Sequence, residues 1–135
     1  MMVSYLLDTD TGVSYMCGVS GLRTKMDGIS FNRCAISVIT LAELKFGAEN
    51  SNRREERQKE IELFCNPLTV FTLIEVLDIY AKEKVRLRRL GKPIAEFDLL
   101  IGATAIHYGL VLVTNNVKHF ERMQRLTIEN WTTQG

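Results

Sequence analysis

The sequence is poor in the residues and patterns that mark several specialised classes of protein. It has only three cysteines, Cys17, Cys34 and Cys65, an odd number at wide spacing. They resemble neither a disulfide framework nor a zinc site, and they predict reduced thiols in the cytoplasm. No run of about 18 apolar residues occurs, and the N-terminus lacks a basic region followed by a long apolar run. We therefore expect neither a membrane span nor a targeting segment.

An excess of charge of one sign and glycine-rich phosphate loops are missing as well. The 17 basic and 16 acidic side chains leave a formal charge of +1, so no global basic field indicates nucleic acid, although a local basic stripe would suffice. Neither G-x-x-x-x-G-K-[ST] nor G-x-G-x-x-G occurs, which disfavours a nucleotide held by a glycine cradle. The remaining composition, 46% apolar and 24% charged over 135 residues, is typical of one soluble domain spanning residues 1–135.

Short apolar runs alternate with helical patterns along the chain. Strands are predicted at 3–7, 34–38, 68–71 and 110–113, with an edge strand at 126–128 before a frayed tail. Helices are predicted at 11–27 with a break at Gly18 and Gly21, and then, after a loop at 28–33, at 37–48, 53–65, 72–91 and 95–108, with a short turn at 119–120. This alternation predicts an α/β fold, with a short, mostly parallel central sheet flanked by helices on both faces.

Several helix boundaries have sequence signals. The T-x-x-E patterns at 40–43 and 72–75 fit capping boxes, and Ser37 offers another start for the first of these helices. Segment 95–108 is apolar nearly all round, so we expect it to be buried, with His107 packed and hydrogen-bonded inside.

Three acidic residues stand beside apolar segments, whereas most acids lie in charged runs. Asp8 follows the first strand, Glu43 shares a helical face with Ile39, and Asp98 opens the apolar helix. A buried carboxylate must be capped, paired, protonated or bound to metal. Taken singly, a helix cap explains Asp8 and Asp98, and a capping box explains Glu43. Taken together, they favour a shared site.

Small residues predict how the acids meet. Gly102, Ala105 and Gly109 lie on the same side as Asp98 and invite close approach by the first strand, and Gly47 offers the same beside Glu43. Ligands of open α/β sheets bind at the carboxyl ends of the strands. Oxygen ligands alone favour Mg²⁺ or Mn²⁺ over zinc, and such a metal activates water for phosphodiester hydrolysis.

Two charged segments each allow two interpretations. Residues 53–60 form either a solvated helix face or an arm gripped by a partner. The basic side chains Lys84, Arg86, Arg88 and Arg89 either suit the helix dipole or contact RNA phosphate. His119 lies near the proposed site as a further candidate phosphate contact.

The order and spacing of five motifs resemble PIN-domain ribonucleases of the VapC type, toxins of bacterial type II toxin–antitoxin pairs. The motifs are YLLDTDT at 5–11, ISVITLAELKFGA at 36–48, RRLGKPIAEFDLLIGATAIHYG at 88–109, LVTNN at 112–116 and F-E-R-x-x-x-L-x-I-E-N-W at 120–131. The resemblance covers nearly the full chain and implies a PIN fold.

The resemblance also implies a site and an activity. Asp8, Glu43 and Asp98 would hold one Mg²⁺ or Mn²⁺, with Asn116 as a catalytic residue at the outer edge of the metal site. The activity would be endoribonuclease cleavage of RNA by metal-activated water. The implied partners are a cognate antitoxin that inserts a C-terminal segment near the site, operator DNA bound through that antitoxin, and a second copy in a homodimer.

The substrate would meet a different set of side chains. Thr9 and Thr114 are similar to family hydroxyls that orient a carboxylate, water or substrate, and Arg86 and Arg89 would steer RNA. Helical segments 11–27 and 53–65 would form the antitoxin groove.

The chain departs from the family pattern at three places. Asp10 stands where many relatives have Asn, Asn115 and Asn116 stand where many PIN domains supply a fourth acid, and His119 stands where relatives often carry an acid. A non-catalytic nucleic-acid-binding module acting with the antitoxin is therefore the main alternative. A phospho-acceptor domain using Asp8 or Asp10 is disfavoured, because it requires a lysine at the end of a late strand, where this chain has Thr114-Asn115-Asn116.

Overall fold

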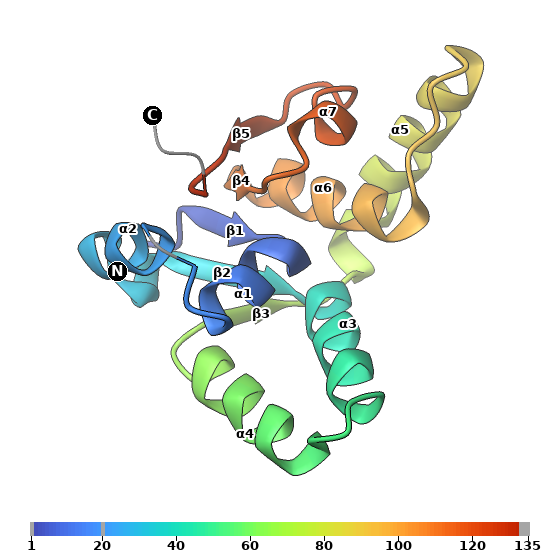
Figure 1. Cartoon of the computed structure of the whole chain (residues 1–135). Helices are drawn as coiled ribbons and strands as arrows, with labels where there is room; N and C mark the ends of the chain where they lie inside the picture. The colour runs from blue at the N-terminus through green and yellow to red at the C-terminus, as the bar shows by residue number, and fades with distance from the viewer. Residues whose placement is uncertain (1, 20, 133–135) are drawn as a thin grey trace.

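The computed structural model, which describes residues 2–19 and 21–132, contains a five-stranded, fully parallel sheet in the order β3-β2-β1-β4-β5 (Figure 1). The strands are β1 (Tyr5–Leu7), β2 (Cys34–Ser37), β3 (Thr69–Phe71), β4 (Val111–Val113) and β5 (Thr127–Glu129). The α-helices are α1 (Thr9–Met16), α2 (Leu22–Ile29), α3 (Val38–Glu49), α4 (Arg54–Cys65), α5 (Leu77–Arg89), α6 (Glu96–Tyr108) and α7 (Val117–Phe120), and two 3₁₀ turns are η1 (Phe31–Arg33) and η2 (Ile74–Val76). The predicted parallel α/β architecture is confirmed.

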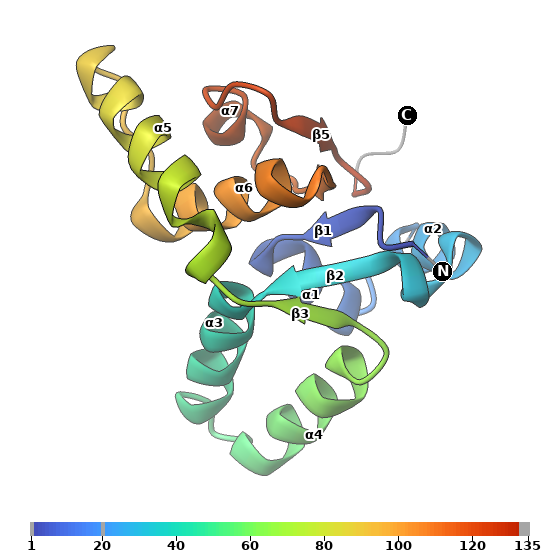
Figure 2. The same cartoon turned by 180° about the vertical axis from the view of Figure 1, so that it is seen from behind.

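Two apolar cores lie on opposite faces of the sheet because successive strand residues point to opposite sides. Leu7 of β1 packs in one core with side chains of α2, α3 and α4, whereas Leu6 packs in the other with side chains of α5, α6 and α7. Figures 1 and 2 show α3 and α4 extending from one side of the sheet and α5 from the other. The expected cover of helices on both faces is confirmed.

The first helical segment divides as predicted, although its limits differ. Asp8 caps α1, so the helix begins at Thr9 rather than at residue 11. The chain turns between the two helices with Gly18 at φ 75° and Gly21 at φ 85°, in the region that glycine tolerates best. The loop expected at 28–33 is wrong, because these residues hold the end of α2 and the turn η1.

Both capping-box interpretations are wrong. Ser37 caps α3 by accepting a hydrogen bond from the Ile39 amide at 3.0 Å, which leaves Thr40 buried inside the helix. Helix α5 follows η2 directly, and neither element has a side-chain cap. Glu43 is therefore not used as a helix cap.

Helix α6 is buried along its centre but not at its last turn. His107, expected to be buried, is exposed and packs its ring edge-on against Tyr108 with centroids 4.7 Å apart. The helix ends at Gly109, which has the left-handed φ of 65° that such a stop requires.

At two glycines the structure differs from the close approaches that we expected. A Cβ at Gly102 would overlap Sδ of Met123, so this small residue receives the segment after α7 rather than the first strand. A Cβ at Gly47 would meet nothing within 4 Å. Small residues predicted that a neighbour comes close to α6, but not which neighbour.

The remaining sequence features can be placed briefly. Among the helices of the described residues, none combines the length and apolar character needed to cross a bilayer. Cys17, Cys34 and Cys65 are free thiols. Trp131 is buried and donates from its ring nitrogen to Glu129 at 2.9 Å, whereas the tail at 133–135 lies outside the described residues.

Candidate active site

The site lies where the strand order reverses. From β1 the chain builds outward through β2 and β3, and then it crosses to the other side of β1 to form β4 and β5. The switch point between β1 and β4 is where open parallel sheets bind ligands, outside the carboxyl ends of the strands. Asp8 follows β1 and Thr114 follows β4, so both residues emerge at this point.

Asp8 is held tightly there. Its side chain is only 4% exposed, accepts the Thr11 amide at 2.8 Å as the N-cap of α1, and accepts the Thr114 hydroxyl. Burial raises the pKa of Asp8, the hydrogen bonds from Thr114 and Thr11 oppose that rise, and the charge of Asp10 adds to it. Asp8 is thus both a helix cap and a buried acid at the switch point.

Glu43 reaches the same edge from α3. The Thr9 hydroxyl donates to Glu43 Oε1 at 2.5 Å, and this contact ties α3 to the first turn of α1. Because Thr9 follows Asp8 directly, one segment carries the first acid and orients the second. This contact supports the predicted role of Thr9 in orienting a carboxylate. Contact of Thr9 or Thr114 with substrate stays a prediction.

Asp98 lies in the first turn of α6 and is partly buried. Ala95 is the N-cap, so Asp98 is not a cap, and its side chain makes no hydrogen bond to any of the described residues. Burial raises the pKa of Asp98 and the charge of Glu43 raises it further, whereas His119 lowers it. Glu43 and Asp98 therefore lie close enough to repel each other, and Asp10 repels both Asp8 and Asp98.

This edge fits a hard divalent cation in its chemistry. Its acids supply only oxygen, the ligand type that Mg²⁺ and Mn²⁺ prefer. Burial raises the pKa of Asp8 and of Asp98, so a bound cation would stabilise the ionised form of both carboxyl groups. Among residues 2–19 and 21–132, however, no three carboxylate, imidazole or thiol groups are close enough to hold one ion as they stand. Binding therefore requires the acids to draw together.

Comparison with known proteins identifies the fold family. The sequence model of the family described as the PIN domain matches residues 18–126. A curated relative from Rickettsia felis, Ribonuclease VapC2, is 38% identical over 101 residues, which are 74% of this chain and 75% of the relative. This chain belongs to the PIN-domain family of VapC ribonucleases. The tRNA(fMet)-specific endonuclease VapC of Salmonella typhimurium is 33% identical to this PIN domain over 131 residues, 96% of this chain and 99% of the relative.

Solved structures agree with the family assignment. The DNA-bound VapBC of Salmonella typhimurium contains a chain that superposes on this PIN domain with a TM-score of 0.91 at 32% identity, over 96% of this chain and 99% of that one. The VapBC-1 structure from Haemophilus influenzae gives a TM-score of 0.87 at 30% identity, over 97% and 100%.

A chain of hydrogen bonds that the sequence did not reveal runs out from Asp8 of this PIN domain. The Thr114 hydroxyl donates to Asp8, the Asn116 backbone amide donates to Thr114 Oγ1 at 2.9 Å, and the Asn116 side-chain nitrogen lies 2.9 Å from Nδ1 of His119. The T-N-N triplet after an apolar strand is the signal for such a turn. It places Asn116, predicted to be catalytic, one step removed from the acid.

The basic end of α5 contains a hydrogen-bonded ion pair. The Arg86 guanidinium donates to both carboxylate oxygens of Glu83 at 3.0 and 2.8 Å and to the Arg122 carbonyl at 2.7 Å. Glu83, missed in the sequence, is 7% exposed, and the hydrogen bond from Arg86 lowers its pKa. Arg86 thus fastens the segment after α7 onto α5, and its contact with RNA stays a prediction. Arg89 is exposed, and its contact with RNA stays a prediction.

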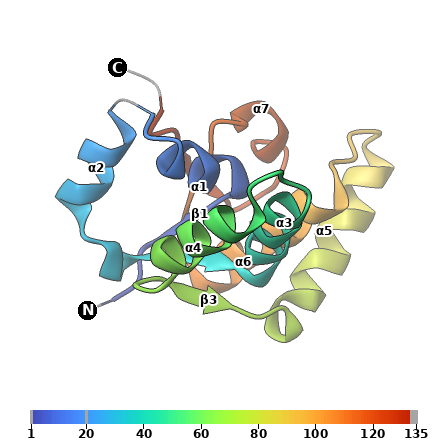
Figure 3. The ribbon, with the colours of Figure 1, turned by 60° about the horizontal axis from the view of Figure 1, so that its bottom comes forward.

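An apolar groove of about 280 Å³ opens between α1, α3 and α4, on the side that Figure 3 brings forward. Val13, Met16 and Ile61 line it, and Gly47 leaves room because its Cβ would touch nothing. Glu43 stands at its edge, so the groove opens beside the candidate active site. The groove expected between segments 11–27 and 53–65 exists, with α3 as an additional wall.

Proposed function

We propose that this chain is a metal-dependent endoribonuclease and the toxin of a toxin–antitoxin pair. The observation that supports the proposal is that Asp8 stands at the switch point, while the neighbouring Thr9 orients Glu43, whose charge acts on Asp98. RNA is the substrate class because the relatives are named ribonucleases. RNA as substrate and three free thiols suit action in the cytoplasm.

The chain's own residues position the reaction. Asp8, Glu43 and Asp98 would hold Mg²⁺ or Mn²⁺, and such an ion, when bound, polarises phosphate and lowers the pKa of water. Thr114 and the Thr11 amide fix the Asp8 carboxylate, and the Thr9 hydroxyl fixes Glu43. The Asn116 backbone amide donates to Thr114 Oγ1 and so holds the hydroxyl that binds Asp8. This positioning of Thr114 is the part that we assign to Asn116 in catalysis.

A non-catalytic module that binds nucleic acid with its antitoxin remains the second candidate. It is favoured by Asn116 and His119 in place of acids beside the site. It is also consistent with the neighbouring VapBC2 of Rickettsia felis, which was solved on a DNA fragment from its promoter. For this chain we assign any operator binding to the antitoxin, because the formal charge of +1 offers no basic field of its own.

Metal removal separates the two candidates. Purified protein free of antitoxin should cleave RNA in Mg²⁺ or Mn²⁺, lose cleavage in excess EDTA, and recover it when either ion is restored, because the acids repel one another without a cation. Cleavage is followed on a labelled RNA by gel electrophoresis. RNA that stays intact with both ions, in protein shown by circular dichroism to be folded, would leave only the binding module.

The antitoxin is assigned to the groove between α1, α3 and α4. The walls are apolar, as a peptide-binding groove requires, and Arg57 and Glu60 add a polar rim. A segment lying in this groove would pass Glu43, so the occupant would reach the acids that cut RNA. This geometry links antitoxin binding directly to inhibition.

A second copy of the chain is assigned to the outer face of α5. There Ile74, Leu77, Ala81 and Val85 follow one another at helical spacing on the solvent side, with Ile74 77% exposed and Leu77 and Val85 each 46% exposed. We call these four residues the α5 stripe. Acidic Asp78 lies near its start and basic Arg89 beyond its end. Antiparallel pairing of two stripes therefore sets opposite charges together across a two-fold axis.

Charges placed in the α5 stripe should separate the copies. Leu77→Glu combined with Val85→Glu sets like charges face to face in an apolar contact, so we expect dimer affinity to fall at least about hundredfold. Light scattering after size-exclusion chromatography measures the mass. Leu63→Glu, at an equally apolar position of α4 that is 78% exposed, is the matched control and should leave the dimer intact. An unchanged mass for the double variant would exclude this face.

A further inference from the structure

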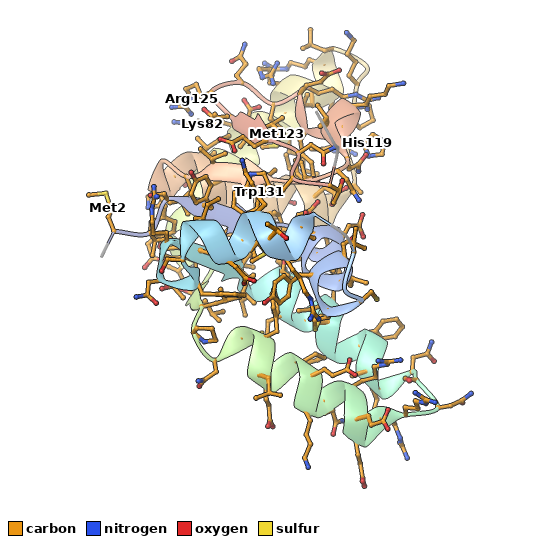
Figure 4. The ribbon with its side chains drawn as sticks, turned by 60° about the vertical axis from the view of Figure 1, so that its left-hand side comes forward. Met2, Lys82, His119, Met123, Arg125 and Trp131 are labelled. Carbon is orange, nitrogen blue, oxygen red and sulfur yellow. The ribbon has the colours of Figure 1, made fainter. Side chains whose placement is uncertain are left out.

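We propose that Asn116 and His119 form a phosphate-binding subsite for the RNA strand, in which Nε2–H of His119 donates to a phosphodiester oxygen. The inference rests on the proposed ribonuclease function and gives Asn116 and His119 a part in binding its substrate. Its first support is position. His119 lies on α7, across the molecule from Met2 at the start of the chain in Figure 4, and thus toward the carboxyl ends of the strands.

Packing fixes α7 beside the acids. Phe120 is fully buried, and it lies with Met123 against Gly102 of α6. Gly102 follows Asp98 by four residues, so both occupy one face of that helix. Helix α7 therefore rests on the face of α6 that carries Asp98, and His119 precedes the buried Phe120 directly. The charge effect of His119 on the pKa of Asp98 agrees with this placement.

Hydrogen bonds fix the ring. The Asn116 side-chain nitrogen, 2.9 Å from Nδ1 of His119, can only donate, so Nδ1 accepts and Nε2 carries the proton of the neutral ring. Asn116 is itself anchored through Thr114 to Asp8. The ring thus presents a hydrogen-bond donor, and not an acceptor, from an exposed side chain beside the acid cluster.

The acidic surroundings of His119 indicate why a hydrogen-bond donor at this position would bind a phosphate. An RNA strand approaching the site meets Asp8, Asp10, Glu43 and Asp98, which repel its phosphates. A donor at this place offsets part of the repulsion and holds a phosphate while leaving the carboxylates free for the cation. An acid at position 119 would do the opposite.

Binding to RNA without cleavage tests the subsite. In a Glu43→Gln background, which keeps an acceptor for the Thr9 hydroxyl, His119→Ala should weaken binding of a labelled single-stranded RNA about ten- to hundredfold, the loss expected for a hydrogen bond to a charged group. His119→Asn should lose as much, whereas His119→Gln, whose amide nitrogen reaches the place of Nε2, should restore most of it. Fluorescence anisotropy in Mg²⁺ gives the dissociation constants.

The other histidine supplies the matched control. His107 is also exposed but packs on Tyr108 at the far end of α6, so His107→Ala should bind RNA like the background protein. Asn116→Ala should weaken binding less than His119→Ala, because it only frees the ring. Equal dissociation constants for the alanine, asparagine and glutamine variants and the background would overturn the subsite. Absence of cleavage by the unmutated protein would instead overturn the ribonuclease proposal, and this subsite with it.

Discussion

Replacing Asp98 with asparagine is expected to abolish RNA cleavage and to stabilise the metal-free protein at the same time. Loss of a charged ligand should lower cleavage at least about hundredfold, since even residues behind metal ligands often cost 10–100-fold. Stability should rise because burial and Glu43 raise the pKa of Asp98, so its ionised form is disfavoured in the fold. Discounted for partial exposure, we expect a gain of roughly 1–3 °C in melting temperature.

The stability gain should depend on pH in one direction. A carboxyl whose pKa is raised by folding contributes stability that is complete below its unfolded pKa and is lost as the pH rises through the folded value. The unmutated protein therefore lacks that contribution at neutral pH, and Asp98→Asn removes the penalty. The difference in melting temperature should be present at pH 7 and should close below about pH 4, where Asp98 is protonated in both states.

Two comparisons separate this effect from a general change in stability. Asp27→Asn, the same change at an exposed acid of α2, should leave both cleavage and melting temperature unchanged. Added Mg²⁺ should raise the melting temperature of the unmutated protein more than that of Asp98→Asn, because only the former keeps all three acids. Equal cleavage by Asp98→Asn and the unmutated protein would refute the assignment of Asp98 to the metal.

The site could be predicted where local sequence alone determines the structure. Asp8 after an apolar run had to emerge at a strand end, and a parallel sheet brings such ends to one edge. The two interpretations of Asp8, cap and site, did not compete, because one oxygen accepts the Thr11 amide while the other faces Thr114. For Glu43, by contrast, the capping-box interpretation was wrong, because α3 begins after Ser37 and both Thr40 and Glu43 lie inside the helix.

The errors come from contacts between segments distant in sequence. Arg86 and Glu83 belong to a charged run that resembles a solvated helix face, and nothing local shows that Arg122 and Gln124 cover them. These tertiary contacts bury Glu83, and through them the ion pair holds the segment after α7 against α5. For His107 the error is the reverse, because we predicted burial for a side chain that is exposed. The apolar pattern of the helix suggested burial up to its last turn, which the core does not reach.

Phe120→Ala should be among the most destabilising single changes in the chain. The ring is fully buried in the core formed with α5 and α6, so its removal should cost about 3–5 kcal/mol. For a domain of this size, that loss corresponds to a fall of roughly 10–20 °C in melting temperature, measured by calorimetry. Phe46→Ala makes the same change at a position 72% exposed and should shift stability by less than about 0.5 kcal/mol.

Coupling to Gly102 tests why Phe120 matters. A methyl group at Gly102 would displace Met123 and would lie 3.6 Å from the Phe120 ring, so Gly102→Ala alone should overpack this contact. In the Phe120→Ala background Met123 can move into the space left by the ring and away from the methyl group, so Gly102→Ala should cost less or even stabilise. Additive effects of the two changes would mean that α7 is not held through this contact, and that another contact places Asn116 and His119 beside Asp98.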